Sequence, residues 1–71
     1  MWYVYICKKG NKLYTGITTE IANRLKQHNN PKLIHLEERA TRIDAAKREK
    51  QIKGWGRDKK LLIANLKVNL S

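Results

Sequence analysis

A single glutamate, Glu49, lies where a helix usually buries apolar side chains. The segment Thr41–Lys53 is predicted to form a helix. At about 100° per residue, one arc of that helix carries Ala45, Ala46, Glu49 and Ile52. A carboxylate on this arc costs free energy unless a metal ion or an arginine pairs with it. The ordinary alternative is a partly exposed salt bridge.

Two tyrosines and an arginine could join Glu49 in hydrolysing a phosphodiester bond. That reaction needs a group that activates or positions water, positive charge that meets the developing negative charge on phosphorus, and usually a metal. Tyr5 and Tyr14 are predicted on one face of a hairpin, and Arg24 lies on the margin of the buried face of the next helix. These side chains converge only if both helices pack on the tyrosine face of the sheet.

The hairpin prediction rests on Gly10-Asn11, a dipeptide typical of tight turns, between the aromatic and β-branched segments Trp2–Lys8 and Lys12–Ile17. Opposed residues in such a pair share a face. One face is then expected to carry Tyr5, Cys7, Tyr14 and Gly16. The other face is expected to carry Trp2, Val4, Ile6, Leu13, Thr15 and Ile17. Because glycine has no side chain, Gly16 leaves a gap in front of the ring of Tyr5.

The rest of the chain predicts one more strand and three helices. A first helix starts at Thr18-Thr19-Glu20 and runs to about His28, and Asn29-Asn30-Pro31 stops it. A third strand is expected over Lys32–Glu38, and a capping-box pattern opens the second helix at Thr41. A final helix is expected over Asp58–Leu66. The order β-β-α-β-α-α predicts a small α/β fold with a three-stranded, largely antiparallel sheet flanked by helices, in one domain over residues 1–71.

The charge of the chain points to a partner rich in phosphate. Sixteen Lys and Arg against six Asp and Glu give a formal net charge of +10 on 71 residues, and the sequence pI is about 10.1. Such a balance is typical of nucleic-acid binding. A membrane surface is the weaker alternative, because no helix combines a basic face with a broad apolar one. RNA is a weaker partner than DNA, since the chain carries neither a ribonucleoprotein motif nor a GXXG clamp.

The number of cysteines and the length of the apolar segments indicate the cellular compartment. Cys7 is the single cysteine, which excludes an intrachain disulfide and a zinc cluster of thiolates. The chain must fold by packing alone, which suits a reducing environment. No apolar run approaches the ~20 residues needed to span a bilayer, and no secretory signal opens the sequence. We therefore expect a cytoplasmic protein.

The order and spacing of these residues resemble the GIY-YIG nuclease family, in particular its minimal single-domain bacterial members. The resemblance rests on Tyr3-Val4-Tyr5, Tyr14–Thr18, Arg24–Asn29 and Arg48–Trp55, and it covers nearly the whole chain. It implies a GIY-YIG-like fold and an endonuclease that cuts DNA with one divalent ion, Mg²⁺ or Mn²⁺. The enzyme is expected to be structure-selective or weakly sequence-specific. Because nothing resembles an appended specificity domain, any such preference must come from this small surface or from a partner, or be absent.

The resemblance also implies a role for each candidate. Tyr5 or Tyr14 would position or activate the attacking water, Arg24 would stabilise the transferring phosphate, and Glu49 would bind the metal. His28 is a further catalytic or phosphate-contacting candidate. The chain offers one carboxylate at this site, and Mg²⁺ tolerates that because water and phosphate complete its coordination. The DNA backbone is expected to meet Lys47, Arg48, Lys50, Lys53, Lys59 and Lys60.

Each candidate also has a purely structural interpretation. Tyr14 could be an ordinary sheet aromatic, His28 a core or capping residue, and the lysines a solvated helix face. Arg24 could form an i,i+4 pair with Glu20. The segment between His28 and the third strand is shorter than in similar proteins, which favours, as the alternative function, a catalytically weak or inactive nucleic-acid-binding module.

Overall fold

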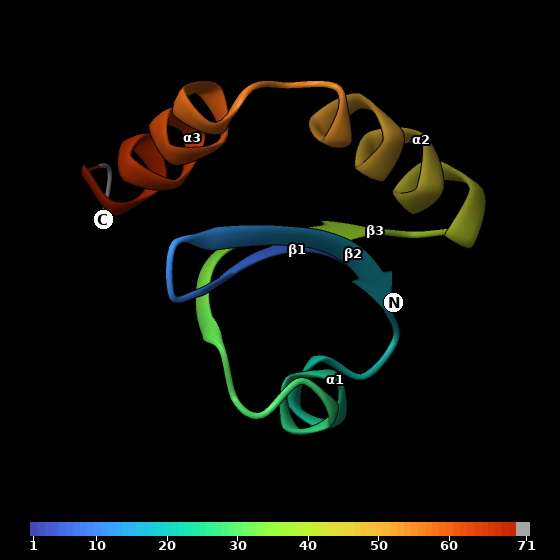
Figure 1. Cartoon of the computed structure of the whole chain (residues 1–71). Coiled ribbons are helices and arrows are strands. Elements are labelled where there is room, and N and C mark those ends of the chain that lie inside the picture. Colours follow the sequence, from blue (N-terminus) through green and yellow to red (C-terminus); the bar gives the residue numbers. More distant parts are fainter. Residues whose placement is uncertain (70–71) are drawn as a thin grey trace.

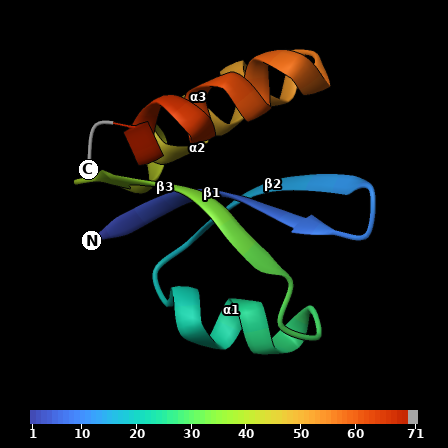
Figure 2. The ribbon, with the colours of Figure 1, turned by 90° about the vertical axis from the view of Figure 1, so that its left-hand side faces the viewer.

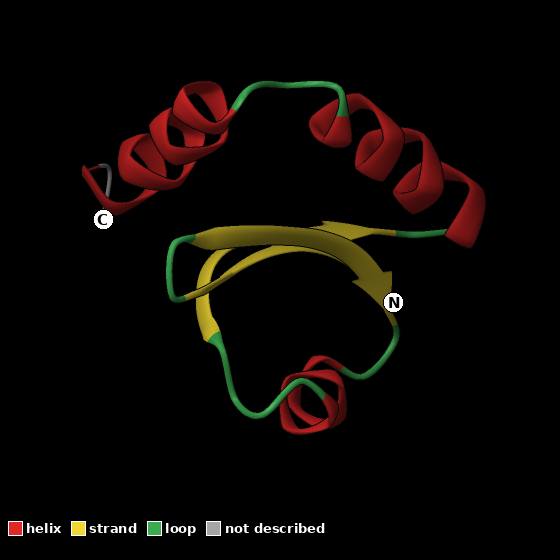
Figure 3. Cartoon of the chain, viewed as in Figure 1, coloured by secondary structure: helices red, strands yellow, loops and turns green. Residues whose placement is uncertain are grey.

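Three strands and three helices follow one another in the predicted order β-β-α-β-α-α (Figure 1, Figure 3). The computed structural model describes residues 1–69, with side chains as far as residue 64. The elements are β1 (Trp2–Lys9), β2 (Lys12–Thr18), α1 (Ile21–Gln27), β3 (Lys32–Arg39), α2 (Arg42–Lys53) and α3 (Arg57–Asn69). Within these residues, no helix has the length and apolar character that a bilayer crossing requires.

The sheet has the strand order β2-β1-β3, and β1 pairs with both neighbours in the antiparallel sense. The predicted hairpin register is confirmed, because Tyr5 lies opposite Gly16 and Cys7 lies opposite Tyr14. Gly10, with φ of 61°, supplies the left-handed backbone that the turn needs. Since β2 and β3 are both antiparallel to β1, they run parallel to each other. The segment with α1 is therefore a crossover connection over one face of the sheet.

The helices cover both faces of the sheet. Figures 1 and 2 show α1 on one side, with α2 and α3 together on the other. The buried core lies under α2, where Val4 and Ile6 of β1 pack against Ala45 and Ile52. The packing of both α1 and α2 on the tyrosine face, on which the predicted convergence of the site residues depended, is therefore not found. The physical reason is that the crossover helix occupies the tyrosine face, so the more apolar Val4/Ile6 face must be covered by the later helices.

The ends of the helices agree with the predictions in one case and differ in another. The hydroxyl of Thr41 accepts a hydrogen bond from the backbone N–H of Asp44 at 3.2 Å, which caps α2 as predicted. Helix α1 begins later than predicted, at Ile21, because the hydroxyl of Thr18 accepts the N–H of Glu20 in a turn before the helix. This shorter helix contains no fully buried residue.

Candidate active site

The first pair of site residues, Tyr5 and Arg24, is joined by a direct hydrogen bond. Nε of Arg24 on α1 donates to the hydroxyl oxygen of Tyr5 on β1 at 3.2 Å. This hydrogen bond and the electrostatic interaction with Tyr5 raise the pKa of Arg24. The predicted alternative, an ion pair of Arg24 with Glu20, is not formed, because Glu20 accepts a hydrogen bond from the side chain of Asn23 instead.

The ring of Tyr5 fills the gap that Gly16 leaves. Tyr5 is only 3% exposed, and a Cβ atom added at Gly16 would lie 2.7 Å from Cζ of Tyr5 and closer still to its hydroxyl. No real Cβ atom approaches a ring so closely. Gly16 therefore permits the Tyr5 hydroxyl to lie over β2, where Arg24 reaches it.

Tyr14 and His28 lie together on the same side of the sheet. Tyr14 lies opposite Cys7 on the neighbouring strand and is 46% exposed. His28 is the exposed C-cap residue that follows α1. Both line one cavity of about 210 Å³, which we call the Tyr14 cavity. Its wall consists of Cys7, Lys9, Tyr14, Gln27, His28, Asn29 and Pro31. The structure thus brings Tyr5, Tyr14, Arg24 and His28 to the face that α1 covers.

Glu49 is the candidate that the structure places apart from the others. It lies on α2, across the sheet from α1, and Nζ of Lys53 approaches its carboxylate at 3.3 Å. Helical geometry turns Glu49 away from Arg48, which is bound to β3. Helix α2 also contacts β2, the edge strand that carries Tyr14 and Gly16. Because α2 lies on the other face of the sheet, the predicted condition for convergence is not met, and Glu49 can reach the phenols only around an edge of the sheet.

Comparison with known proteins identifies the family. A family model described as the GIY-YIG catalytic domain matches residues 1–61. The chain belongs to the GIY-YIG family. UPF0213 protein SH2523 of Staphylococcus haemolyticus is 38% identical over 72 residues, an alignment that covers 83% of this chain and 88% of the relative. UPF0213 protein HQ_3675A of Haloquadratum walsbyi is 36% identical, with 87% and 84% covered.

A solved structure has the same arrangement of strands and helices as this GIY-YIG domain. The solution NMR structure of UPF0213 protein BH0048 from Bacillus halodurans matches with a TM-score of 0.66 and 28% sequence identity. The match covers 94% of this chain and 86% of that one. The fold predicted from the sequence is thus shared with a relative of known structure.

GIY-YIG domains are nuclease domains, and they generally use divalent metals. In this GIY-YIG domain, the described residues contain no cluster of three or more His, Cys, Asp or Glu side chains that could hold an ion. One carboxylate fits Mg²⁺ or Mn²⁺ only where water and phosphate supply the other ligands, as is usual for Mg²⁺ at phosphate sites. In this structure the carboxylate of Glu49 is paired with Lys53.

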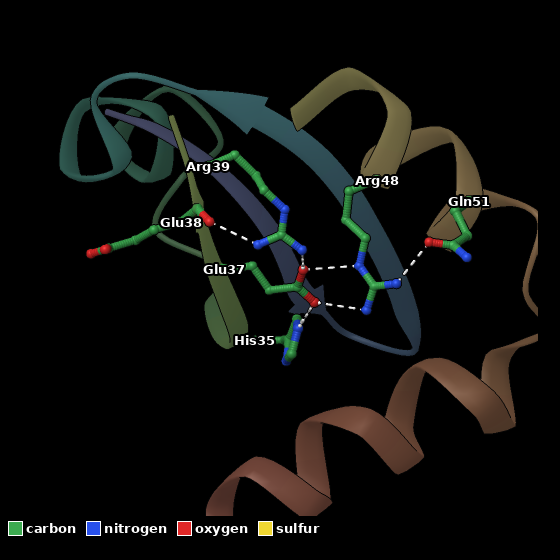
Figure 4. A network of polar contacts seen from close by, with 6 residues as sticks. All are labelled: His35, Glu37, Glu38, Arg39, Arg48 and Gln51. Carbon is green, nitrogen blue, oxygen red and sulfur yellow. Dashed lines mark hydrogen bonds and ion pairs between the residues drawn. The ribbon is translucent and has the colours of Figure 1, made fainter. Parts of the chain in front are cut away.

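A second acidic centre, which the sequence does not predict, lies around Glu37 on β3. Its carboxylate receives Nε of Arg48 at 2.9 Å, Nη2 of Arg39 at 2.7 Å and Nε2 of His35 at 2.6 Å (Figure 4). Burial alone would raise the pKa of Glu37, but the hydrogen bonds and positive charge of Arg48 and His35 lower it to about 2. The sequence signal that could have predicted this centre is the alternation of His35, Glu37 and Arg39, which places all three on one face of the strand.

Within this network of the GIY-YIG domain, Arg48 has a mainly structural role. Its guanidinium binds Glu37 through two nitrogens, donates to Gln51 at 2.8 Å and lies 5.0 Å from the ring centre of Trp55. Few of its donors remain for DNA. It therefore ties α2 to β3.

The predicted lysines differ in their surroundings. Lys47 and Lys50 are exposed and line a groove along α2 together with Arg39, Asp44 and Arg48. Lys53 is paired with Glu49, and Lys59 lies 4.4 Å from the ring centre of Trp55. Lys60 is partly buried on α3. The most accessible positive charge among them is therefore that of Lys47 and Lys50.

Proposed function

We propose that this chain is a divalent-metal-dependent DNA endonuclease that hydrolyses phosphodiester bonds with weak sequence specificity or with selectivity for DNA structure. The observation that carries the proposal is the hydrogen bond from Arg24 to Tyr5, on a sheet face that also presents Tyr14 and His28. A guanidinium held against a phenol provides positive charge and a polar hydroxyl at one place, and both are needed where water attacks phosphorus. Membership of a nuclease family supports the same conclusion.

Each side chain has a distinct task in this proposal. Two of the five N–H groups of Arg24 are used by Tyr5 and Gln27, so others can meet a phosphate oxygen. Tyr14, which is half exposed, positions the attacking water, and His28 exchanges a proton with solvent or the leaving oxygen. Glu49 would hold the Mg²⁺ or Mn²⁺ ion, which would supply Lewis-acid polarisation of a phosphate oxygen.

The DNA backbone meets the charged face of α2 in this proposal. Lys47 and Lys50 are the exposed contacts, with Lys53, Lys59, Lys60 and the remaining donors of Arg48 at the margins. Contacts of this kind bind phosphate without reading bases. Binding should therefore be insensitive to sequence and should weaken as salt is added.

The test of the proposal is cleavage of branched, flapped and nicked DNA with Mg²⁺, with Mn²⁺ and with a chelator. We expect metal-dependent cuts by the native chain and a loss of about 100-fold or more in Glu49→Ala and Arg24→Ala, the scale of removing one charge-stabilising group. Glu38→Ala, a change of the same type at an exposed position on β3, is the matched control. Cleavage no greater than that of Glu49→Ala would contradict the proposal.

A second candidate function is a nucleic-acid-binding module without cleavage. It is favoured by one observation, the place of Glu49 across the sheet from Tyr5 with its carboxylate neutralised by Lys53. This candidate predicts salt-sensitive binding of DNA with no cut in any metal. It also predicts that Glu49→Ala leaves affinity unchanged or raises it, because a negative charge is removed.

A further inference from the structure

The Tyr14 cavity has the size and the lining of a site for one flat ring system. Its volume of about 210 Å³ is below the ≈ 300–1,000 Å³ of sites for drug-sized ligands. The lining residues include a tyrosine, a histidine, a lysine, a glutamine and an asparagine, and no Asp or Glu is among them. Cys7 is 1% exposed, and burial raises the pKa of its thiol, which keeps this part of the wall neutral.

Gln27 connects this cavity to the arginine that is proposed to bind phosphate. Gln27 lines both the Tyr14 cavity and a neighbouring polar depression that contains Arg24. Its Oε1 accepts a hydrogen bond from Nη1 of Arg24 at 3.4 Å, longer than the 2.7–3.2 Å of a strong bond. A ligand can therefore replace this bond at little cost. A phosphate at Arg24 and a ring in the cavity would be next to each other, as in one nucleotide.

The loop that closes the cavity has an unusual backbone. Asn29 and Asn30 both have positive φ, of 62° and 52°, a region that asparagine tolerates better than most residues but that still costs free energy. Backbone strain of this kind concentrates at ligand-binding loops. The strained loop supplies the Asn29 amide to the cavity wall.

We propose that the Tyr14 cavity receives the base of an unpaired nucleotide whose phosphate lies at Arg24. The ring of Tyr14 provides a stacking surface, and the amides of Gln27 and Asn29 provide both donors and acceptors for the edge of the base. A base inside a duplex cannot enter such a cavity, because it must first leave its stack. The inference rests on the proposed function, and it assigns to the enzyme a substrate with an unpaired nucleotide beside the cut.

The experiment is an NMR titration of the ¹⁵N-labelled full chain in chelator, so that no cleavage occurs. Thymidine 5′-monophosphate is compared with 2-deoxyribose 5-phosphate, which has the phosphate and sugar but no base. We expect both ligands to shift the Nε signal of Arg24. Both ligands should also shift the side-chain amide signal of Gln27, because a phosphate at Arg24 replaces the hydrogen bond between these residues. Only the nucleotide should shift the side-chain amide signal of Asn29, and it should bind about tenfold more tightly because of stacking.

Variants separate the cavity from the phosphate site. Gln27→Ala should reduce nucleotide affinity toward that of the sugar phosphate and leave the sugar phosphate unaffected. Gln51→Ala, the same change on α2 across the sheet, is the control and should preserve the tenfold difference. Retention of the tenfold difference in Gln27→Ala would contradict the role assigned to that amide.

The possible failures are distinguishable. Equal affinities of the two ligands, with a shift at Arg24 and none at Asn29, would overturn the base site and leave the proposed function standing. Absence of a shift at Arg24 with either ligand would overturn the phosphate site of the proposed function. A shift of Asn29 by the nucleotide alone would in that case show a base in the cavity with its phosphate elsewhere, and would overturn the placement of the phosphate at Arg24.

Discussion

Replacement of Glu37 by glutamine should remove a large, pH-dependent contribution to the stability of the fold. The carboxylate is bound by Arg48, Arg39 and His35, and its side chain is 14% exposed. The difference between an ordinary pKa of 4.5 and about 2 corresponds to about 3 kcal/mol of unfolding free energy at neutral pH. Loss of this acid from a buried cluster should cost a similar amount.

The sign of the pH dependence follows from the lowered pKa. The unfolded chain takes up a proton on Glu37 near pH 4.5, whereas the folded chain does so only near pH 2. The contribution is therefore complete above about pH 5 and is lost as the pH falls toward 2. The native chain should become less stable over this range by about 3 kcal/mol more than Glu37→Gln does.

Urea unfolding of the native chain and of Glu37→Gln at pH 7, 4.5, 3 and 2 measures this difference. Glu38→Gln is the matched control, because Glu38 is the next residue on β3 and is exposed, so its loss should cost below about 0.5 kcal/mol. The reasoning would be refuted if the two variants had the same stability at pH 7, or if Glu37→Gln kept the pH dependence of the native chain.

Three further predictions concern the site and its supports. Gly16→Ala should force the ring of Tyr5 aside, lower the free energy of unfolding by about 1–3 kcal/mol and slow cleavage at least tenfold. A melting temperature and a cleavage rate equal to those of the native chain would contradict the close approach of Tyr5 to Gly16. Thr41→Ala should cost about 1 kcal/mol by removing the cap of α2, as measured by thermal unfolding; an unchanged midpoint would contradict it. Lys47→Ala combined with Lys50→Ala should reduce the salt slope of duplex binding by about 2; an unchanged slope would place the DNA elsewhere.

The local structure of this chain could be predicted because short-range patterns determine it. Gly10-Asn11 sets the turn, and the turn sets the register that places Tyr5 opposite Gly16. The cap at Thr41 likewise follows from a few adjacent residues. The start of α1 differs because the hydroxyl of Thr18 bonds in the preceding turn, a choice that the spacing of residues does not determine.

The packing of the helices was harder to predict because it depends on topology. Tyr5 and Glu49 each satisfy a local pattern, yet the face that each helix covers is set by the crossover from β2 to β3. Once α1 covers the tyrosine face, α2 must cover Val4 and Ile6. The Glu37 network was missed for the same reason, since Arg48 meets Glu37 only when α2 packs on that face.

The central claim is that one divalent ion, bound by Glu49, serves the face that presents the tyrosines and Arg24. Anomalous diffraction from crystals soaked with Mn²⁺ and a short DNA measures it most directly. We expect one ion bonded to Glu49 at an edge of the sheet, with Lys53 displaced and a phosphate between the ion and Arg24. Glu49 still paired with Lys53 at saturating Mn²⁺, with the ion at another carboxylate, would contradict it.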